Sequence, residues 1–274
     1  MQEELRMRLM NVAREMRIDS LNMSFHAGSA GAHLGGGLSM IEIMAVLYCK
    51  IINIDPQNPL DENRDRVILS KGHGVLAYYA ALVQKGFISR EDLSTFKSDE
   101  TILTGHPSMD SSHGIELSSG SLGQGLSAGV GCALALRRKK NENSRVFVIL
   151  GDGECNEGSV WEAAMSASHF ELDNLYAVID KNGLQYDGST ENVMNMNSMK
   201  EKWEAFGFET YEVEGHDVLQ LVDVFSKKSI NKPTAIIANT VKGKGISFME
   251  NVPKWHHAVL NKNQLEEALR ELGA

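Results

Sequence analysis

The sequence predicts an α/β fold with a doubly wound, mostly parallel sheet and helices on both of its faces. The first observation is that short apolar runs, such as residues 146–150 and 175–179, alternate with segments of helical periodicity. Strands that alternate with helices are typical of a parallel sheet covered on both sides. The second observation is the length of 274 residues, which is enough for one large domain with a full core. We therefore expect residues 1–274 to form a single domain.

The expected elements begin with a surface helix over residues 3–21, where apolar side chains recur at helical spacing. A polar, glycine-rich stretch follows over residues 26–37. Ser39 stands where it can cap a helix over residues 40–51, and Ser89 where it can cap a later helix. The expected strands are 66–69, 146–150, 175–179, 209–213 and 234–239, and further helices are expected to end near residue 85 and to cover 123–139, 199–206, 217–228 and 263–272.

Three long polar segments, residues 98–122, 181–198 and 241–257, are expected to be loops. Loops of this length inside a compact domain are usually functional. In parallel α/β folds the ligand lies at the carboxyl ends of the strands. Because these loops follow or neighbour expected strand ends, we expect them to converge at that edge of the sheet.

Composition argues against several classes of protein. The net charge of −9 does not fit a general nucleic-acid or anionic-membrane binder. No apolar run approaches the length of a membrane span, and the charged N-terminal segment has no apolar signal core. Cys49, Cys132 and Cys155 have neither a CxxC nor a metal-binding spacing. Reduced thiols of this kind indicate a cytoplasmic protein.

The most informative motif is Gly151-Asp152-Gly153, followed later by Asn182. Each follows an expected strand, and the two side chains are 182 − 152 = 30 residues apart, about the length of one βαβ unit. Oxygens at neighbouring strand ends, with a backbone carbonyl near Leu184, can bind a hard cation such as Mg²⁺ or Ca²⁺. That cation can in turn bind a diphosphate. The alternative is a simple Gly-Asp-Gly turn and an unrelated loop asparagine.

A second motif, Ser-Ser-Gly-Ser-Leu-Gly-Gln-Gly over residues 118–125, leads into an expected helix. Small residues allow a ligand to approach the backbone closely, and a helix N-terminus favours anions. A helix entry with close packing explains the same residues. This motif is therefore a weak signal when it is considered alone.

Histidines form the third group of candidate residues. Four of them lie in polar loops and are flanked by glycine or proline: His33, His73, His106 and His256. Histidine titrates near neutral pH and can donate or accept a proton. A single loop histidine is usually a surface residue, but four on loops around one edge of a sheet indicate a site. The remaining histidines are interpreted as structural or exposed: His26, His113, His169, His216 and His257.

Other common sites do not fit the sequence. Neither HExxH nor a Cys/His ligand spacing for zinc occurs. Residues 31–36 do not follow an expected strand, and residues 241–245 lack the helix that a dinucleotide fingerprint needs. Lys71, Lys242 and Lys244 can approach a phosphate, but we interpret them as solvated loop lysines.

Taken together, these segments resemble the N-terminal, diphosphate-binding domain of transketolase, an enzyme that uses thiamine diphosphate. The resemblance covers essentially the whole chain and rests on an ordered set of motifs: His33-Leu-Gly-Gly, Leu69-Ser-Lys-Gly-His73, Thr104-Gly-His106-Pro, Gly120-Ser-Leu-Gly-Gln-Gly125, Gly151-Asp-Gly and Trp255-His256. One departure is that Ala32 precedes His33 and Leu34 follows it, where many relatives carry Ser-Gly-His-Pro.

The resemblance implies a role for each candidate residue. The metal ligands would be Asp152, Asn182 and the carbonyl of Leu184, with Mg²⁺ as the ion and Ca²⁺ or Mn²⁺ as substitutes. The cofactor would be bound by His73, Gly120, Leu122, Gly153, Asn182 and His256. The catalytic residues, which would line the substrate channel and assist proton transfer, would be His33, His73, His106 and His256. Glu157 and Glu162 look like the acids of the family's subunit interface.

The resemblance also implies a partner. Transketolases bind the pyrimidine ring of the cofactor in a second domain, which we expect on a separate chain, in an assembly of two copies of each subunit. The implied reaction moves a two-carbon ketol unit from a ketose phosphate to an aldose phosphate. Two alternatives remain open. One is a subunit of another thiamine diphosphate enzyme, of the deoxyxylulose-phosphate-synthase or 2-oxoacid-decarboxylating type, and the other is a non-catalytic partner module.

Overall fold

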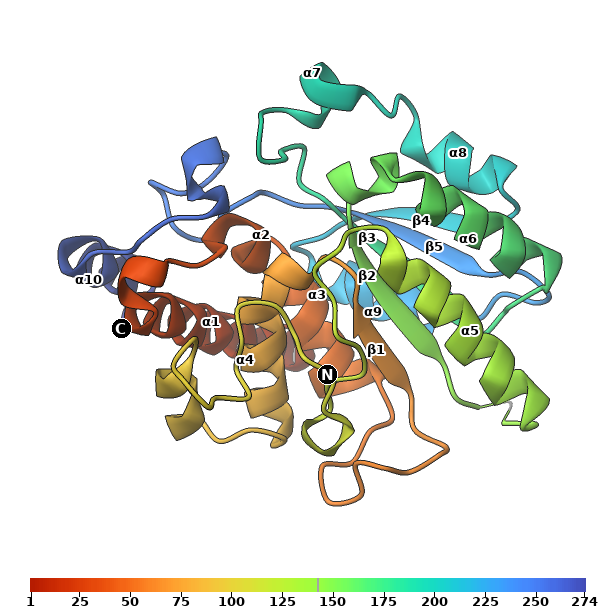
Figure 1. The fold of residues 1–274 in the computed structure, drawn as a ribbon, viewed down its shortest axis with the longest axis horizontal. Coiled ribbons are helices and arrows are strands. Elements are labelled where there is room, and N and C mark those ends of the chain that lie inside the picture. Colours follow the sequence, from red (N-terminus) through yellow and green to blue (C-terminus); the bar gives the residue numbers. More distant parts are fainter. Residues whose placement is uncertain (142) are drawn as a thin grey trace.

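A parallel sheet organises the computed structural model, which describes residues 1–141 and 143–274 (Figure 1). In this part of the chain five strands pair in the order β1-β2-β3-β5-β4, and each pairing is parallel. The strands are β1 (Arg66–Leu69), β2 (Val146–Gly151), β3 (Leu175–Lys181), β4 (Glu209–Glu214) and β5 (Thr234–Asn239). The predicted α/β fold is confirmed. Because the strands are parallel, their carboxyl ends lie at one edge of the sheet.

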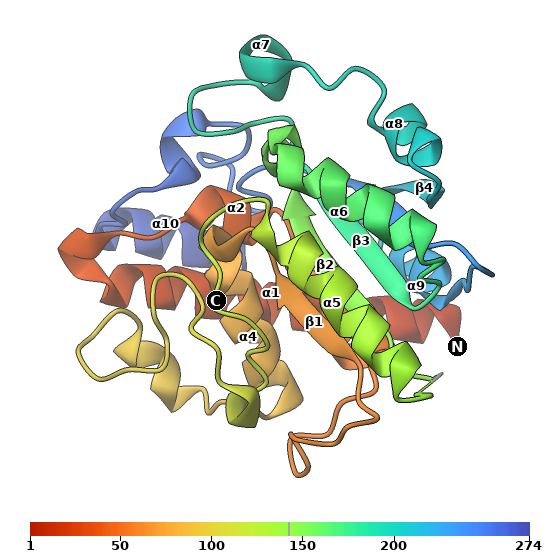
Figure 2. The ribbon, with the colours of Figure 1, turned by 45° about the vertical axis from the view of Figure 1, so that its right-hand side comes forward.

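The α-helices of the described residues are α1 (Gln2–His26), α2 (Leu34–Leu38), α3 (Ile41–Val46), α4 (Val75–Lys85), α5 (Gln124–Arg138), α6 (Gly158–His169), α7 (Thr190–Met194), α8 (Met199–Ala205), α9 (Val218–Ser226) and α10 (Lys262–Glu271). Short 3-10 helices cover Gly28–Ala30, Gly72–Gly74, Glu91–Thr95, Ser111–His113, Gly153–Asn156 and Pro253–His256. Figure 2 shows α5 and α6 lying across one face of the sheet.

The two faces of the sheet belong to two apolar clusters. Phe147 and Ile149 of β2 pack in the cluster that contains side chains of α1, α3, α4 and α9. Val148 and Leu150 of the same strand pack in the cluster that contains side chains of α5, α6 and α8. Successive side chains of a strand point to opposite faces, so β1, β2, β3 and β5 each contribute to both clusters. The predicted cover of helices on both faces is therefore confirmed.

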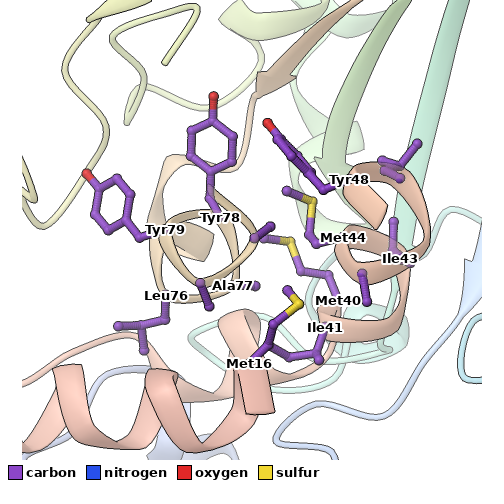
Figure 3. Close-up of a cluster of buried hydrophobic side chains, with 14 of the residues drawn as sticks. Met16, Met40, Ile41, Ile43, Met44, Tyr48, Leu76, Ala77, Tyr78 and Tyr79 are labelled. Carbon is purple, nitrogen blue, oxygen red and sulfur yellow. The ribbon is translucent and has the colours of Figure 1, made fainter. Parts of the chain in front are cut away.

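The larger cluster supports the segments that lead to the carboxyl edge. Met16 of α1, Met40, Met44 of α3 and Tyr78 of α4 are buried together in it (Figure 3). The hydroxyl of Tyr78 donates to the carbonyl oxygen of Gly114 at 2.9 Å, so this polar group is satisfied inside the core. α4 follows directly after the segment that carries His73, and its packing therefore fixes that segment.

Three expectations for the N-terminal third are wrong in detail. The glycine-rich stretch is not a loop throughout, because residues 34–38 form α2, whose side chains are buried. Ser39 does not cap the next helix. It lies at the C-terminal end of α2, and its hydroxyl donates to Asp180 at 2.5 Å. The expected helix over residues 40–51 is α-helical to Val46 and continues as a π-helix over Leu47–Ile51.

Short helices also interrupt the expected loops. Residues after Ser89 form a 3-10 helix rather than an α-helix, although the Ser89 hydroxyl accepts from the backbone N–H of Asp92 at 3.2 Å, as expected of a cap. The loop 181–198 contains α7, which lies at the margin of the fold in both views (Figure 1, Figure 2). The loop 241–257 contains the 3-10 helix Pro253–His256.

Two further observations concern the environment of the protein. Among residues 1–141 and 143–274, no helix is both long and apolar enough to cross a membrane. Cys49, Cys132 and Cys155 are free thiols. Cys155 is buried two residues after the Gly-Asp-Gly motif, and burial raises the pKa of its thiol well above the ordinary value, so it is held in the neutral form.

Candidate active site

Successive strand ends deliver the candidate residues to one cavity. Lys71 follows β1, Asp152 follows β2, Asn182 follows β3 and Lys242 follows β5. All four line a cavity of about 440 Å³. Neighbouring strands of a parallel sheet place their carboxyl ends side by side. Side chains far apart in the sequence therefore meet here because of the strand order.

The predicted metal ligands are brought together. Asp152 is 4% exposed, and its carboxylate accepts from the backbone N–H groups of Gly153 at 2.9 Å and Gly183 at 2.6 Å. Asn182 Oδ1 accepts from the N–H of Leu184 at 3.1 Å, and all three predicted ligands line the cavity. Burial, together with repulsion from Asp180, raises the pKa of Asp152 to about 6. A bound cation would relieve that cost, so the site fits a hard cation.

The donor set matters for the kind of metal. In the described part of the chain, no three side chains of His, Cys, Asp or Glu are grouped so that they can hold an ion. Cation binding at Asp152 would therefore depend on the amide oxygen of Asn182, on the carbonyl of Leu184 and on ligand oxygens. Such an all-oxygen set suits Mg²⁺ or Ca²⁺ rather than zinc.

A buried ion pair lies beneath these ligands, and it is absent from the sequence-based prediction. The ammonium of Lys71 contacts the carboxylate of Asp180, and neither side chain is more than 1% exposed. Asp180 also accepts from the hydroxyls of Ser39 and Thr240 and from Asn182 Nδ2, the last at 3.1 Å. Burial favours a raised pKa for Asp180, but Lys71 lowers it below the ordinary value. Asp180 therefore orients the side-chain amide of Asn182. Nδ2 points to Asp180, and Oδ1 lies on the side of the amide away from Asp180.

The interpretation of two lysines as solvated is wrong. Lys71 also donates to the carbonyl of Gly36 at 2.7 Å. Lys242 is 2% exposed, and its amino group lies 2.7 Å from the carbonyl of Leu184 and 2.9 Å from His256 Nδ1. Burial, and then repulsion from Lys71, lowers the pKa of Lys242 to about 8. Only Lys244 resembles the expected surface residue, since it is about one-third exposed and paired with Glu250.

Glu154 is a second buried acid that the sequence-based prediction missed. Its carboxylate accepts from the N–H of Gly123 at 2.9 Å, the hydroxyl of Ser70 at 2.5 Å and the N–H of Gly151 at 3.0 Å. Burial raises the pKa of Glu154, and the three donors satisfy its oxygens. Glu154 therefore ties the ends of β1 and β2 to the loop that carries Gly120 and Leu122.

The predicted cofactor contacts of that loop lie beside the site. Gly120 has φ 157°, and a Cβ there would come within 3.4 Å of the His106 ring. Leu122 lines the cavity. At Gly153 a Cβ would come within 2.5 Å of Gln185 Oε1, so a larger residue would require the Gln185 side chain to move. Leu122 and Gly153 therefore face the cavity, whereas Gly120 packs beside His106.

The four predicted histidines form one cluster. The ring centroid of His33 is 5.5 Å from those of His73, His106 and His256, and His73 and His256 are 5.3 Å apart. Burial, followed by the neighbouring His257, lowers the pKa of His33 to about 3. Burial, followed by Lys242, lowers the pKa of His256 to about 4. These imidazoles are neutral at physiological pH and can each both donate and accept a hydrogen bond.

His257, interpreted as structural or exposed, also belongs to this cluster, because its ring lies 4.6 Å from His33. His216 does have a structural role. Its Nδ1 contacts Glu42 at 3.0 Å and its Nε2 accepts from the N–H of Val241 at 2.8 Å. Arg17 completes this group by pairing with Glu42 at 2.6 Å. The group fixes the backbone just before Lys242.

Glu157 and Glu162 are both exposed. Glu157 precedes the first residue of α6 and lines the cavity, whereas Glu162 lies one turn further along the same helix. Their exposure is compatible with a subunit interface, and that role stays a prediction.

The histidine cluster is expected to make the stability of the protein dependent on pH. The pKa values of His33 and His256 in the folded chain, about 3 and 4, lie below the ordinary value of 6.5. As the pH falls below 6.5, the unfolded chain binds protons that the folded chain excludes, so the free energy of unfolding decreases. We expect a lower Tm near pH 5 than near pH 7.5 in thermal melts followed by circular dichroism. Partial exposure of both rings reduces the size of the effect.

A matched pair of variants tests whether His33 causes the difference in Tm between the two pH values. His33→Asn should narrow the difference between the two Tm values, because it removes one excluded proton. His26→Asn, which alters an exposed residue at the end of α1, should leave the difference unchanged. An unaltered difference in His33→Asn would show that the pH dependence arises elsewhere.

The fold and the site define a class of protein: an α/β cofactor-binding domain with oxygen ligands, amino groups and imidazoles at the carboxyl edge of a parallel sheet. The family model for "Transketolase, thiamine diphosphate binding domain" matches residues 5–274. The chain therefore belongs to the transketolase family, as a thiamine diphosphate-binding domain of the transferase class. The resemblance inferred from the sequence is confirmed.

Relatives of similar length are named as transketolase subunits. The chain is 45% identical to an apulose-4-phosphate transketolase subunit of Phocaeicola vulgatus, over 88% of this chain and 85% of the relative. It is 40% identical to the 6-deoxy-6-sulfo-D-fructose transketolase subunit SqwG of a Clostridium species, over 96% of this chain and 94% of the relative. These relatives support the assignment of the chain as an N-terminal subunit of the split transketolase type.

Solved transketolases are longer. The structure of transketolase from Campylobacter jejuni superimposes with a TM-score of 0.90 at 31% sequence identity. The match covers 97% of this chain and 42% of that chain. The described fold is therefore that of one part of the larger enzyme.

Proposed function

We propose that this chain is the diphosphate-binding subunit of a two-chain transketolase, which moves a two-carbon ketol unit from a ketose to an aldose. The observation that carries the proposal is the meeting of Asp152, Asn182 and the Leu184 carbonyl in one cavity with Lys71 and Lys242. The cavity thus offers oxygen ligands for a cation and amino groups for phosphate oxygens. The histidine cluster lies directly beside it.

The proposed arrangement assigns Mg²⁺ to Asp152, Asn182 and the Leu184 carbonyl, with Ca²⁺ or Mn²⁺ as substitutes. Lys71 and Lys242 would neutralise the diphosphate together with the metal ion, since both amino groups are buried at the cavity. The remaining proposed contacts to the cofactor are His73, His256, Gly153, Gly120 and Leu122.

Thiamine diphosphate, when bound, supplies the carbon nucleophile that attacks the ketose carbonyl. The chain's own residues would bind the sugar and move protons. His33, His106 and His256 are neutral imidazoles around one space, so they can accept protons from sugar hydroxyls and return them. Their low pKa values keep the acceptor form populated.

We further propose that a separate chain supplies the pyrimidine-binding domain, in an assembly with two copies of each subunit. The names of the relatives of similar length, which are called subunits, support this proposal. Residues 1–274 would then form a single domain, and Glu157 and Glu162 would face a neighbouring subunit. Free cysteines support a cytoplasmic location for the assembly.

The direct test mixes the purified chain with thiamine diphosphate, Mg²⁺, a ketose phosphate and an aldose phosphate. Ketol transfer, measured by product chromatography, should require addition of a pyrimidine-domain subunit from a related split transketolase. Pyruvate should release no carbon dioxide under the same conditions. Full turnover by the chain alone would contradict the two-chain proposal, and carbon dioxide from pyruvate would indicate a decarboxylating enzyme instead.

A further inference from the structure

A buried acid, Glu42 of α3, links two parts of the chain that are distant in the sequence. One of its oxygens pairs with Arg17 of α1 at 2.6 Å, and the other contacts Nδ1 of His216 at 3.0 Å. The side chains of Glu42 and Arg17 are 3% and 6% exposed. Burial favours a raised pKa for Glu42, but Arg17 and His216 lower it below the ordinary value. These two partners therefore hold Glu42 as a carboxylate.

Arg17 and His216 each also bind the segment that follows β5. Nε2 of His216 accepts from the N–H of Val241 at 2.8 Å, and Nε of Arg17 donates to the carbonyl oxygen of Lys244 at 3.0 Å. The N–H of Lys244 donates to the carbonyl oxygen of Val241 at 3.1 Å, so residues 241–244 form a closed turn. One side chain therefore holds the first residue of this turn, and another side chain holds its last residue.

The hydrogen bonds of His216 assign the proton on its ring. A backbone N–H can only donate, so Nε2 of His216 is an acceptor and carries no hydrogen. The hydrogen of the neutral ring is then on Nδ1, which donates it to the carboxylate of Glu42. Glu42 thus fixes the tautomer that the N–H of Val241 requires.

The turn over residues 241–244 carries Lys242 to the cavity. The amino group of Lys242 lies 2.7 Å from the carbonyl oxygen of Leu184 and 2.9 Å from Nδ1 of His256. The next residue, Gly243, has φ 78°, a left-handed conformation that glycine adopts readily. The position of the Lys242 amino group therefore depends on the path of this turn.

Core stability alone does not explain a charged group at this place. Apolar residues of similar volume often stabilise a core as well as a buried ion pair does. The chain neighbours of Glu42, Ile41 and Ile43, belong to the same apolar cluster as Met16 (Figure 3). What the charged side chains add here is directed hydrogen bonds to the turn over residues 241–244.

We propose that Arg17, Glu42 and His216 are positioning residues for the cofactor, which act by holding Lys242 at the diphosphate position of the cavity. The proposal rests on the proposed function, in which Lys242 binds the diphosphate together with the metal ion. It goes further, because none of these three side chains is among the residues that line the cavity. Side chains of α1, of α3 and of the loop after β4 then set the affinity of a site at the end of β5.

Calorimetric titration of the purified chain with thiamine diphosphate, in the presence of Mg²⁺, tests the proposal. His216→Ala should weaken binding about 10-fold, as the loss of a partner behind a ligand typically does. His216→Gln should retain most of the affinity, because its amide can accept from the N–H of Val241 and donate to Glu42. His169→Ala is the matched control, since His169 is exposed at the end of α6, and it should leave the affinity unchanged.

A double-mutant cycle separates positioning from a general structural effect. Lys242→Met should itself weaken binding, because it removes an amino group from the diphosphate. His216→Ala added to Lys242→Met should then cause a further loss of less than about twofold, since the residue through which it acts is already gone. Full additivity of the two losses would overturn the proposal, because it would show that His216 affects the site by another route.

Acetylation of lysines by a succinimidyl ester, followed by peptide mass spectrometry, gives a readout that needs no cofactor. Lys242 is 2% exposed and should react slowly in the wild-type chain. His216→Ala should speed the acetylation of Lys242 about 10-fold, because a hydrogen bond to the turn is lost. Lys71, which is 1% exposed, should stay protected in both chains and so report that the rest of the site is intact.

Arg17→Lys is a milder variant for the case that His216→Ala does not fold. It keeps the positive charge but loses the Nε donor to the carbonyl oxygen of Lys244, so it should lower the affinity for thiamine diphosphate and speed the acetylation of Lys242. If the wild-type chain does not bind thiamine diphosphate, the proposed function fails, and acetylation alone decides the role of the three residues. Unchanged acetylation of Lys242 in the variants, or an equal rise at Lys71, would overturn the proposal.

Discussion

Replacing Asp152 by alanine is expected to weaken Mg²⁺-dependent binding of thiamine diphosphate by more than about 100-fold. The expectation exceeds the usual effect of removing a residue behind a metal ligand, which is about 10- to 100-fold, because Asp152 is the proposed anionic ligand itself. Its carboxylate also accepts from the N–H groups of Gly153 and Gly183, so the variant loses the turn that places Asn182. Isothermal titration calorimetry of the purified chain, with Mg²⁺ and with EDTA, measures the difference.

Two further variants make this result specific. Asn182→Ala should cause a loss in the same direction, because it removes the second proposed side-chain ligand. Glu191→Ala removes an exposed acid from the segment that follows β3, as Asn182 does. This variant should leave the affinity for thiamine diphosphate unchanged. Wild-type affinity in Asp152→Ala, with Mg²⁺ present, would show that the Gly-Asp-Gly motif is only a turn.

Replacing Lys71 by methionine is expected to lower the free energy of unfolding by about 3–5 kcal/mol. The substitution leaves the carboxylate of Asp180 buried without its cation, although the hydroxyls of Ser39 and Thr240 still donate to it. An uncompensated buried charge is one of the few causes of losses this large. Urea denaturation of the purified chain gives the value, provided that the dependence on urea concentration is unchanged.

An exposed ion pair at the end of β3, the strand that also carries Asp180, provides the control. Lys181 pairs with Glu212 at 2.8 Å, and both side chains are more than one-third exposed. Lys181→Met should therefore cost less than about 1 kcal/mol. The double variant Lys71→Met with Asp180→Leu should lose less than the sum of the single variants, since it removes both charges. A loss below about 1 kcal/mol in Lys71→Met would mean that the pair does not hold the site together.

Much of the fold could be predicted because the strands are apolar runs of the usual length. The five predicted strands agree with β1 to β5 to within a residue or two at their ends. The convergence of Asp152 and Asn182 could also be predicted, since both directly follow strands that neighbour each other in the sheet. The histidines could be grouped because glycine and proline mark their segments as loops.

The rest depends on contacts that no local pattern contains. Lys71 and Lys242 have the glycine neighbours of an exposed loop, yet the sheet places both within one buried charge network. The sequence does carry a signal for Asp180, because an acid at the end of an apolar strand needs a partner if it is buried. Glu154 and His257 adjoin predicted site residues, but only the tertiary packing determines where their side chains lie.

The bridge between Ala32 and Ala258 has a consequence for the order in which parts of the protein fold. Its two partners are 258 − 32 = 226 residues apart in the chain. Closing so long a loop costs conformational entropy, so we expect this contact to form late in folding. The proposed metal ligands Asp152 and Asn182 follow the neighbouring strands β2 and β3. His33 and His256, in contrast, come together only when the bridge between Ala32 and Ala258 has closed. We therefore expect the two metal-ligand side chains to come together in a folding chain before the histidine cluster does.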